Sequence, residues 1–384
     1  MQSQSLKVLS IIGTRPEAIK MAPVVRELRK HGNIVSSVCV TAQHREMLDQ
    51  VLNLFNIVPD YDLNIMRPNQ SLNQIVAGII TTLEPLLSDL QPDWILIQGD
   101  TTTVMTAAIA ARHMGIKIGH VEAGLRTGDM KNPFPEEMNR MIVDAISDLN
   151  FVPTSRAWQN LVREGIPKER ITVTGNTVID ALFEAASLPW KPTVDHPLFM
   201  LFDSQRNILS SSKLILITMH RRENFGSPIQ DICMALKEIA QKSQTPIHFL
   251  YPVHLNPNVY GPVHEILGND PHFTLLPPLD YLSLVNVMKR STLILTDSGG
   301  IQEEAPSLGI PVLVLRKVTE RPEGVEAGTV RVVGIDPAAI VEQTLRLLSD
   351  QEEYEAMARA VNPYGDGHAA EKIVERLLKE VNHI

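Results

Sequence analysis

Short apolar runs alternate with amphipathic stretches along most of this 384-residue chain. Apolar runs without a polar face are typical of parallel strands buried on both sides of a sheet. The stretches between them repeat their apolar positions with the period of a helix. The pattern predicts an α/β fold with strands at residues 7–12, 35–40, 94–97, 116–121, 149–152, 214–218, 247–251, 273–275 and 293–296 and helices at 16–30, 45–55, 72–90, 229–241 and 282–289.

The alternation is interrupted between residues 187 and 213. This stretch contains Pro189, Pro192, Pro197 and three consecutive serines at 210–212, which favour irregular structure. We therefore predict an N-terminal domain at 1–186, a linker at 187–213, a C-terminal domain at 214–366 and a last helix at 367–384 that packs back on the first domain. Two doubly wound, Rossmann-like sheets would hold ligands at the carboxyl ends of their strands, in a central cleft.

Composition narrows the class of protein. A formal net charge of −9 argues against a protein that binds nucleic acid along a basic surface. Cys39 and Cys233 lie far apart in the sequence and suggest neither a disulfide framework nor a cysteine metal site. No signal-peptide pattern and no run long enough to span a membrane is found, so we expect a cytoplasmic enzyme.

Several common cofactor motifs are missing. The first strand is not followed by G-x-G-x-x-G, and neither the P-loop pattern nor H-E-x-x-H occurs. Asp60-Tyr61-Asp62 matches the D-x-D pattern of metal-dependent glycosyltransferases, but it follows Pro59 in an expected loop and we interpret it as a chance match. The sequence thus predicts no nicotinamide, no other cofactor and no metal.

The most informative stretch is residues 293–309, where an apolar strand leads through Asp297 into two glycines and a helix start. Backbone N–H groups at such a helix start favour an anion. Ser298 adds a hydroxyl donor, and Gly299 and Gly300 allow a phosphate to approach the backbone. Glu304, one turn later, is placed to accept hydrogen bonds from ribose hydroxyls. An ordinary strand-to-helix turn is the alternative, but we favour a nucleotide-diphosphate site.

Other charged residues also follow predicted strands or begin helices. Asp100 alone could be a helix N-cap, and Glu136 alone could complement a helix dipole. Their gathering at strand ends instead indicates one site, with cations that can neutralise phosphate oxygens and with three carboxylates that converge on it. The residues are Arg15, Lys20, Asp100, Glu122, Glu136 and His220.

The ordered set of motifs resembles the bacterial non-hydrolysing UDP-N-acetylglucosamine 2-epimerases. The motifs are GTRPEAIK, TAQHREMLDQV, GDTTT, GHVEAGLRTGD, PFPEEMNR, TGNTVIDAL, HRREN, YPVHLNPNV, LTDSGGIQEEAPSLG, TERPEGVEAGT and NPYGDG. They run from residue 7 to about residue 366, so the resemblance covers nearly the whole chain. It implies a glycosyltransferase-B type fold, a UDP-sugar substrate, a homodimer, and interconversion of UDP-N-acetylglucosamine and UDP-N-acetylmannosamine.

The resemblance also implies a mechanism and residue roles. UDP is eliminated across C1 and C2 to give a 2-acetamidoglucal, and it is then re-added to the other face. Asp100, Glu122 and Glu136 would surround the sugar, and His220 would act with them at the diphosphate. The UDP-binding set would be Arg15, Lys20, Leu279, Ser298, Gly299, Gly300, Glu304 and Arg321.

A second, regulatory UDP-sugar site is implied by the same resemblance. Its residues would be Gln43, His44, Glu46, Arg67 and Arg221, although Gln43 and His44 alone could simply cap the following helix. Such a site predicts a slow reverse reaction from UDP-N-acetylmannosamine alone, restored by a trace of UDP-N-acetylglucosamine. Hyperbolic kinetics in both directions, unchanged by Gln43→Ala, would exclude it.

Relatives often carry a polar residue where this chain has Leu279 and an aromatic residue where it has Leu284, so the resemblance is weakest at the residues expected to bind the uracil.

Three other functions are alternatives: a glycosyltransferase of the same fold, a hydrolysing epimerase that releases N-acetylmannosamine, and a sensor without catalysis. Three carboxylates in the first domain argue against the glycosyltransferase. The complete set of carboxylates with His220 argues against the sensor.

Overall fold

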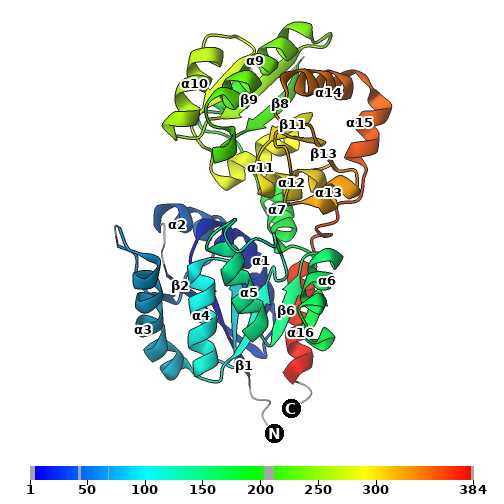
Figure 1. The fold of residues 1–384 in the computed structure, drawn as a ribbon. Coiled ribbons are helices and arrows are strands. Elements are labelled where there is room, and N and C mark those ends of the chain that lie inside the picture. The colour runs from blue at the N-terminus through cyan, green and yellow to red at the C-terminus, as the bar shows by residue number, and fades with distance from the viewer. Residues whose placement is uncertain (1–4, 42–44, 68, 203–211, 382–384) are drawn as a thin grey trace. The chain divides into compact units, whose positions relative to one another are not determined.

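The computed structural model describes residues 5–41, 45–67, 69–202 and 212–381. The chain divides into two compact units (Figure 1). The N-terminal unit comprises the chain up to Phe183 together with the residues from Tyr364 onward, and the C-terminal unit comprises Glu184–Pro363. Each unit has its own parallel sheet.

The sheet of the N-terminal unit has seven parallel strands in the order β3-β2-β1-β4-β5-β6-β7. The chain runs outward from β1 to one edge and then, from β4, to the other, which is the doubly wound arrangement. The strands are β1 (Leu6–Ile12), β2 (Ile34–Val40), β3 (Tyr61–Asp62), β4 (Trp94–Gln98), β5 (Lys117–Val121), β6 (Leu149–Val152) and β7 (Ile171–Val173).

Helices and one short 3₁₀ turn connect these strands. Their starts use ordinary capping chemistry: Thr14 caps α1, and Ser71 and Gln74 form a reciprocal capping box on α3. The helices are α1 (Arg15–Lys30), α2 (Arg45–Leu54), α3 (Leu72–Leu90), α4 (Thr102–His113), α5 (Glu136–Ile146), α6 (Ser155–Arg163), η1 (Lys168–Arg170) and α7 (Thr177–Ser187).

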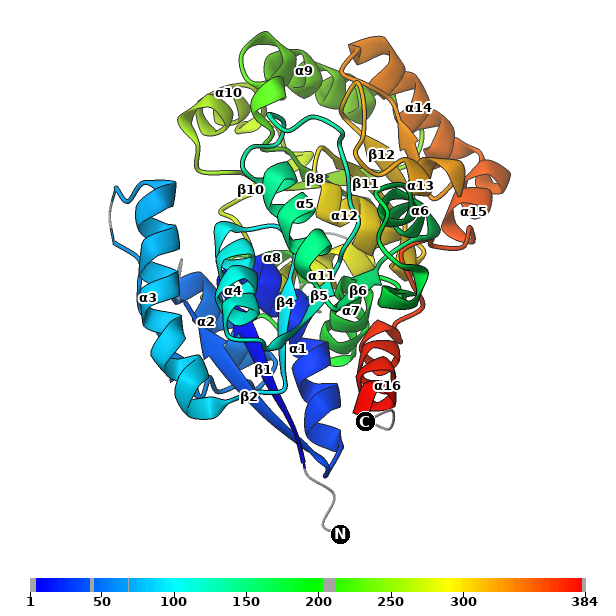
Figure 2. The same ribbon diagram turned by 60° about the horizontal axis from the view of Figure 1, so that its bottom comes forward.

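The last helix, α16 (Ala369–Val381), lies beside α1 in the N-terminal unit (Figure 2). The Asp180 carboxylate on α7 accepts the N–H groups of Ala369 and Ala370, at 3.3 and 2.8 Å. These bonds satisfy two donors at the start of α16, which no backbone carbonyl of the helix itself can reach.

The C-terminal unit repeats the doubly wound plan with six parallel strands in the order β10-β9-β8-β11-β12-β13. The strands are β8 (Lys213–Thr218), β9 (Ile247–Pro252), β10 (Phe273–Leu276), β11 (Leu293–Thr296), β12 (Val312–Val314) and β13 (Val330–Val332). The helices are α8 (Phe199–Phe202), η2 (Arg222–Asn224), α9 (Ser227–Lys242), α10 (Pro257–Leu267), α11 (Tyr281–Arg290), α12 (Gly299–Glu304), η3 (Ala305–Leu308), α13 (Pro322–Glu326), α14 (Pro337–Ser349) and α15 (Gln351–Ala358).

Both sheets place a pair of strands at the point where the strand order reverses. In the N-terminal unit β1 pairs with β4, and in the C-terminal unit β8 pairs with β11. Ligands of doubly wound folds bind outside the carboxyl ends of the strands at this point. The turns after these four strands are therefore where the chemistry is expected. They, or the helix starts that follow them, hold Arg15, Asp100, His220, Ser298 and Gly299.

The α/β prediction of two doubly wound sheets is confirmed. Helix 72–90 and strands 149–152 and 293–296 have the predicted bounds. One detail was wrong: Tyr61 and Asp62 form the short edge strand β3 where a loop was expected. A two-residue strand has too few positions to show a periodic pattern. No helix among the described residues is long and apolar enough to cross a membrane.

The segment predicted as a linker falls in the C-terminal unit in its described parts. The Trp190 indole donates to Ser283 Oγ at 3.3 Å, and the Arg290 guanidinium lies 5.0 Å from the centre of its ring. Stacking of a cation on an indole face is favourable. This stretch therefore has packing of its own against α11.

Candidate active site

The turn after β1 is organised by a buried carboxylate. Glu17 accepts the Gly13 N–H at 2.6 Å and the Thr14 hydroxyl at 3.0 Å, and it also accepts the Thr101 hydroxyl from the turn after β4 at 2.9 Å. Burial raises the pKa of Glu17 from 4.5 to about 7, even though these hydrogen bonds oppose the shift. Glu17 thus joins two neighbouring strand-end turns. Arg15, beside it, is the first residue of α1.

Asp100 is held by α5. Arg140 contacts its carboxylate at 2.6 Å, and the Asn139 amide donates to its backbone carbonyl at 2.8 Å. The N-cap of α4 is Thr101, whose hydroxyl accepts the Val104 N–H. Asp100 is therefore not the helix cap, and its carboxylate is oriented by a cation.

Glu122 lies at the end of β5, next to β4. Its carboxylate is 8% exposed and forms an ion pair with Lys20 of α1, and it accepts the Gln98 amide at 2.9 Å. Its backbone has φ of 66°, in the left-handed region that non-glycine residues rarely adopt. A strained backbone that aims a paired carboxylate at a strand end is typical of functional sites.

Glu136 is the first residue of α5, the helix that also carries Arg140. One of its carboxylate oxygens, Oε2, is buried and has no hydrogen-bond partner among the described residues. A carboxylate left unpaired in this way is available to a ligand. Because Arg140 reaches Asp100, the start of α5 lies at the same edge of the sheet as the Asp100 turn.

In the C-terminal unit, Asp297 organises the turn after β8. Its fully buried carboxylate accepts the N–H groups of His220 at 3.0 Å and Arg221 at 2.9 Å, and the Asn224 amide at 3.0 Å. The His220 ring is 41% exposed. Burial, helped by the charges of Arg221 and Arg316, lowers the pKa of His220 against the opposing effect of Asp297. The imidazole is thus held neutral and able to accept a proton.

The sequence 298–304 forms the helix start that was expected. Ser298 is the N-cap residue of α12, and its hydroxyl does not bond to that helix. Glu304 ends α12 and accepts the Tyr281 hydroxyl at 3.0 Å, while Glu303 forms an ion pair with Arg321. A side chain at Gly299 would begin 3.7 Å from Arg221 and 3.8 Å from Arg321, so two cations flank this turn.

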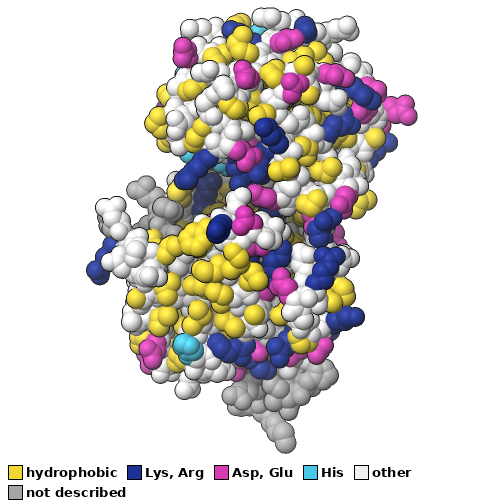
Figure 3. Space-filling model, in the orientation of Figure 1, with side chains coloured by type: hydrophobic (Ala, Val, Ile, Leu, Met, Phe, Trp, Pro, Cys, Tyr) yellow, Lys and Arg dark blue, Asp and Glu magenta, His cyan; other side chains and the backbone are white. Residues whose placement is uncertain are grey.

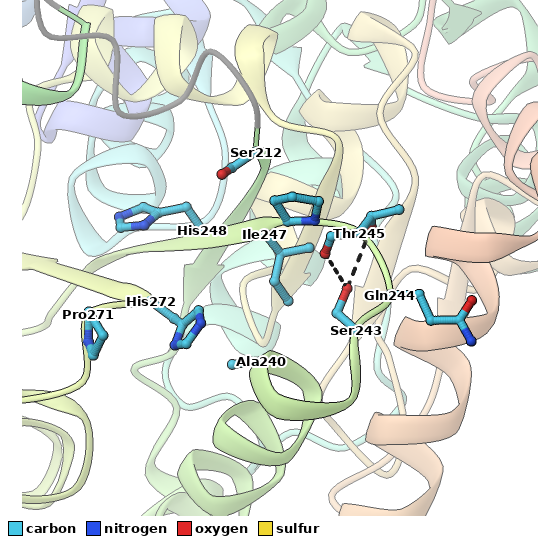
Figure 4. A pocket seen from close by; sticks show the side chains of 10 residues that line it. Ser212, Ala240, Ser243, Gln244, Thr245, Ile247, His248, Pro271 and His272 are labelled. Carbon is cyan, nitrogen blue, oxygen red and sulfur yellow. Dashed lines mark hydrogen bonds between the residues drawn. The ribbon is translucent and has the colours of Figure 1, made fainter.

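Two cavities of the described residues lie elsewhere. One of about 470 Å³ opens at the amino ends of β8 to β10, the edge opposite Asp297, and is lined by His248 and His272 (Figure 4). The other, of about 360 Å³, lies between α5 and α6 and is lined by Arg126 and Glu164. Neither includes a predicted site residue, and the strand-reversal argument places the chemistry at the carboxyl ends.

Comparison with known proteins shows the family of this chain. A model of the family described as UDP-N-acetylglucosamine 2-epimerase matches residues 26–378. The enzyme of that name from Salmonella typhimurium is 54% identical over 97% of this chain and 98% of its own. The one from Neisseria meningitidis is 51% identical over 97% of this chain and all of its own. The chain belongs to the UDP-N-acetylglucosamine 2-epimerase family.

Solved structures extend the comparison. The crystal structure of the Neisseria meningitidis epimerase bound to UDP-GlcNAc has a TM-score of 0.85 at 50% identity, and it covers 97% of this chain and 100% of its own. The Methanocaldococcus jannaschii epimerase in complex with UDP-GlcNAc and UDP has a TM-score of 0.78 at 32% identity, with coverage of 97% and 100%. The glycotransferase of kitacinnamycin, 13% identical with a TM-score of 0.63, covers 97% and 99% and shares the fold alone. The fold is of the glycosyltransferase-B type.

Sequence reasoning missed five buried or partly buried residues that support the candidate site, namely Glu17, Gln98, Arg140, Asp144 and Asp297. Each is a polar residue at less than one-third exposure that bonds to a strand-end turn or to a carboxylate there. A signal was present for Asp297, which ends an apolar strand immediately before Ser298. No periodic pattern marks the others, because their partners are distant in sequence.

Only some of the predicted regulatory residues lie in the part of the chain that the structure describes. Gln43 and His44 lie outside the described residues, and of Glu46 only the backbone, within α2, is described. Arg67 is exposed, and its N–H donates to Gln70 at 2.6 Å. Arg221 lies 3.9 Å from Glu320. The regulatory site therefore stays a prediction from the resemblance.

The two leucines expected near the uracil, Leu279 and Leu284, lie in different elements. Asp280 caps α11, so Leu284 lies in the first turns of that helix, and Leu279 in the preceding loop is half-buried. A leucine on a helix offers no aromatic face for stacking. Contacts to the base from this segment would therefore come from the backbone near Leu279.

Proposed function

We propose that this family member interconverts UDP-N-acetylglucosamine and UDP-N-acetylmannosamine without hydrolysis, through elimination and re-addition of UDP. The observation that carries the proposal is the group of Asp100, Glu122 and Glu136 at one sheet edge, two of them oriented by Arg140 and Lys20. A site that only bound a UDP-sugar would need no such set of carboxylates.

C2 of the sugar is not adjacent to a carbonyl, so removal of its proton cannot form an enolate. The proton must instead leave in an elimination, which needs a base near C2. A carboxylate removes the C2 proton while the bond from C1 to the UDP oxygen breaks, and the C2 electron pair becomes the C1=C2 double bond of 2-acetamidoglucal. Re-addition of UDP at C1 with proton delivery to the opposite face of C2 completes the cycle. Two faces require two proton carriers, and three carboxylates supply them.

The leaving UDP carries negative charge that cations must stabilise. We assign this role to the cations Arg15 and Lys20 of the N-terminal unit and Arg321 of the C-terminal unit, and the neutral His220 would form a hydrogen bond to the diphosphate. Ser298, Gly299 and Gly300 would hold the phosphates at the start of α12, and Glu304 would accept the ribose hydroxyls. The flanking of Gly299 by Arg221 and Arg321 supports this assignment.

The runner-up functions differ in what happens to the sugar. A hydrolysing epimerase would pass the intermediate to water and release free N-acetylmannosamine. A glycosyltransferase of the same fold would need an acceptor. Both would leave UDP in solution, whereas the proposed enzyme returns it to the sugar.

Reaction in deuterated water tests the proposal. With UDP-N-acetylglucosamine and no added metal or nicotinamide, NMR should show both UDP-sugars at equilibrium, each with deuterium at C2, because elimination exchanges that proton. Product that retains protium at C2 would rule out elimination. Accumulation of free sugar and UDP would favour the hydrolysing alternative.

We also propose that the enzyme is a homodimer that joins through α3, α4 and α5 of the N-terminal unit. Figure 3 shows apolar side chains gathered on that unit. The partly buried apolar side chains on α3 to α5, which pack against the core, include Val76, Ile109, Met138 and Ile142. Met141 on α5 is 40% exposed. A continuous apolar face of this kind is typical of an interface between subunits.

A further inference from the structure

Beneath the turns that carry Asp100 and Glu122 lies a fully buried histidine. The His120 ring on β5 places Nδ1 2.6 Å from Asp144 Oδ1 of α5 and Nε2 2.7 Å from the Gly99 carbonyl oxygen. His120 has no exposed surface, and the Asp144 side chain is 1% exposed. Neither residue was assigned a role by the sequence motifs.

The hydrogen bonds determine how many protons the ring holds. A backbone carbonyl only accepts, so Nε2 donates to Gly99. Asp144 Oδ2 accepts the Gly124 N–H at 3.1 Å and pairs with Arg126 at 2.7 Å. Burial alone would raise the pKa of Asp144, but His120 and Arg126 together lower it, so the carboxylate is ionised. Nδ1 must then donate as well, and the ring is an imidazolium.

The charges of this network balance once Glu164, at the surface, is included. Arg126 forms a bidentate pair with Glu164, at 2.7 and 2.6 Å, in addition to its contact with Asp144. His120 and Arg126 carry two positive charges, and Asp144 and Glu164 carry two negative charges. A buried charge that is paired and hydrogen-bonded is tolerated, whereas removing one partner leaves the other uncompensated.

The network forms hydrogen bonds with both proposed catalytic turns. Gly99 precedes Asp100, and Gly124 follows Glu122 by two residues; these two glycines and Glu122 itself have φ of 86°, 80° and 66°. Glycine adopts such a conformation readily, but at Glu122 the left-handed conformation persists only where neighbouring bonds hold it. A Cβ at Gly124 would lie 2.5 Å from the Ala157 carbonyl oxygen, so this turn also packs tightly on α6.

We propose that the His120–Asp144 ion pair is a positioning device that fixes the Asp100 and Glu122 turns relative to each other. This inference rests on the proposed roles of those two carboxylates. His120 bonds to the turn before Asp100, and Asp144 bonds to the turn after Glu122. The direct bond between His120 and Asp144 therefore couples the two turns through a charge-assisted link.

The first test reads the protonation of the ring directly. In protein labelled with ¹⁵N-histidine, the His120 ring should show two protonated nitrogens at neutral pH, because Nδ1 and Nε2 both face acceptors, and its signals are assigned as those lost in His120→Gln. A ring with one unprotonated nitrogen at that pH would overturn the proposal. This measurement uses the wild-type protein and does not depend on whether the variants are active.

The second test uses kinetics. His120→Gln and Asp144→Asn should lower kcat roughly 10²-fold, the size expected when a catalytic group is misplaced by about 1 Å. KM and UDP affinity should change less than about threefold, because UDP is proposed to bind mainly in the C-terminal unit. His248→Gln is the matched control: it removes a partly buried histidine bonded to Thr274 in the other unit, and its kcat should be unchanged.

Variants that keep full kcat while the wild-type enzyme exchanges the C2 proton would overturn the positioning role and leave the elimination mechanism intact. A wild-type enzyme that does not exchange that proton would instead remove the proposed function. Circular dichroism and the melting temperature of each variant separate loss of position from loss of folding.

Discussion

At the residue scale, the three proposed catalytic carboxylates differ in whether they form an ion pair with a neighbouring side chain. Asp100 and Glu122 are each paired with a cation, so an amide at either position leaves Arg140 or Lys20 without that partner. Glu136 has no ion-pair partner among the described residues, and its Oε2 is unbonded. Glu136→Gln therefore removes a charge with the least structural consequence.

Asp100→Asn, Glu122→Gln and Glu136→Gln should each lower kcat at least about 10²-fold, the usual contribution of a positioned acid or base. UDP affinity, measured by calorimetry, should stay within about threefold of wild type, and the melting temperature of Glu136→Gln should be unchanged. Glu265→Gln, at an exposed site on α10, is the control and should retain activity. Near-normal turnover of Glu136→Gln would return that residue to a helix-end role.

At the element scale, the sequence was informative about strands, helices and the turns that join them. Apolar runs located most strands of both sheets, and turn residues located the start of α12 at Ser298. What sequence could not provide was the pairing between distant turns. The bonds from Glu17 to Thr101 and from Asp144 to Gly124 join elements whose contact depends on strand order. Strands of three residues, such as β12, were also too short to show a pattern.

Glu17 offers a test of one such link between elements. Its pKa is raised in the folded protein from 4.5 to about 7, so the folded state keeps a proton that the unfolded chain loses first. The stability that the raised pKa of Glu17 contributes is therefore fully present below pH 4.5, and it is lost as the pH rises through 7. The shift corresponds to about 3 kcal/mol.

Glu17→Gln should remove that pH dependence. In urea unfolding, the free energy of unfolding of the wild type relative to the Glu17→Gln variant should fall by about 3 kcal/mol between pH 4.5 and 8. Because both proteins share every other titrating group, the difference isolates Glu17. Parallel stability curves for the two proteins would show that this carboxyl titrates normally.

At the scale of the whole molecule, the apolar face on α3 to α5 is the proposed contact between two copies of the 42.7 kDa chain. A net charge of −9 per chain opposes association, so the contact must be apolar enough to outweigh that repulsion. A stable interface buries roughly 1,200–2,000 Å² in total. Because α3 packs beside α4 and α4 beside α5, the face spans three adjacent helices, and the proposed dimer requires it to bury an area of this size.

Sedimentation equilibrium should therefore give the mass of two chains at micromolar concentration. Met141→Glu places a charge in the face and should raise the dissociation constant at least about tenfold, since an unpaired charge buried in an interface is costly. Val173→Glu, at a site 46% exposed on β7 of the same unit, is the matched control and should remain dimeric. Far-UV circular dichroism and the melting temperature should be unchanged in both variants, which would show that the substituted N-terminal unit is folded. A wild-type protein that sediments as a single chain would refute the dimer, and a Met141→Glu protein that dimerises normally would move the interface to another face.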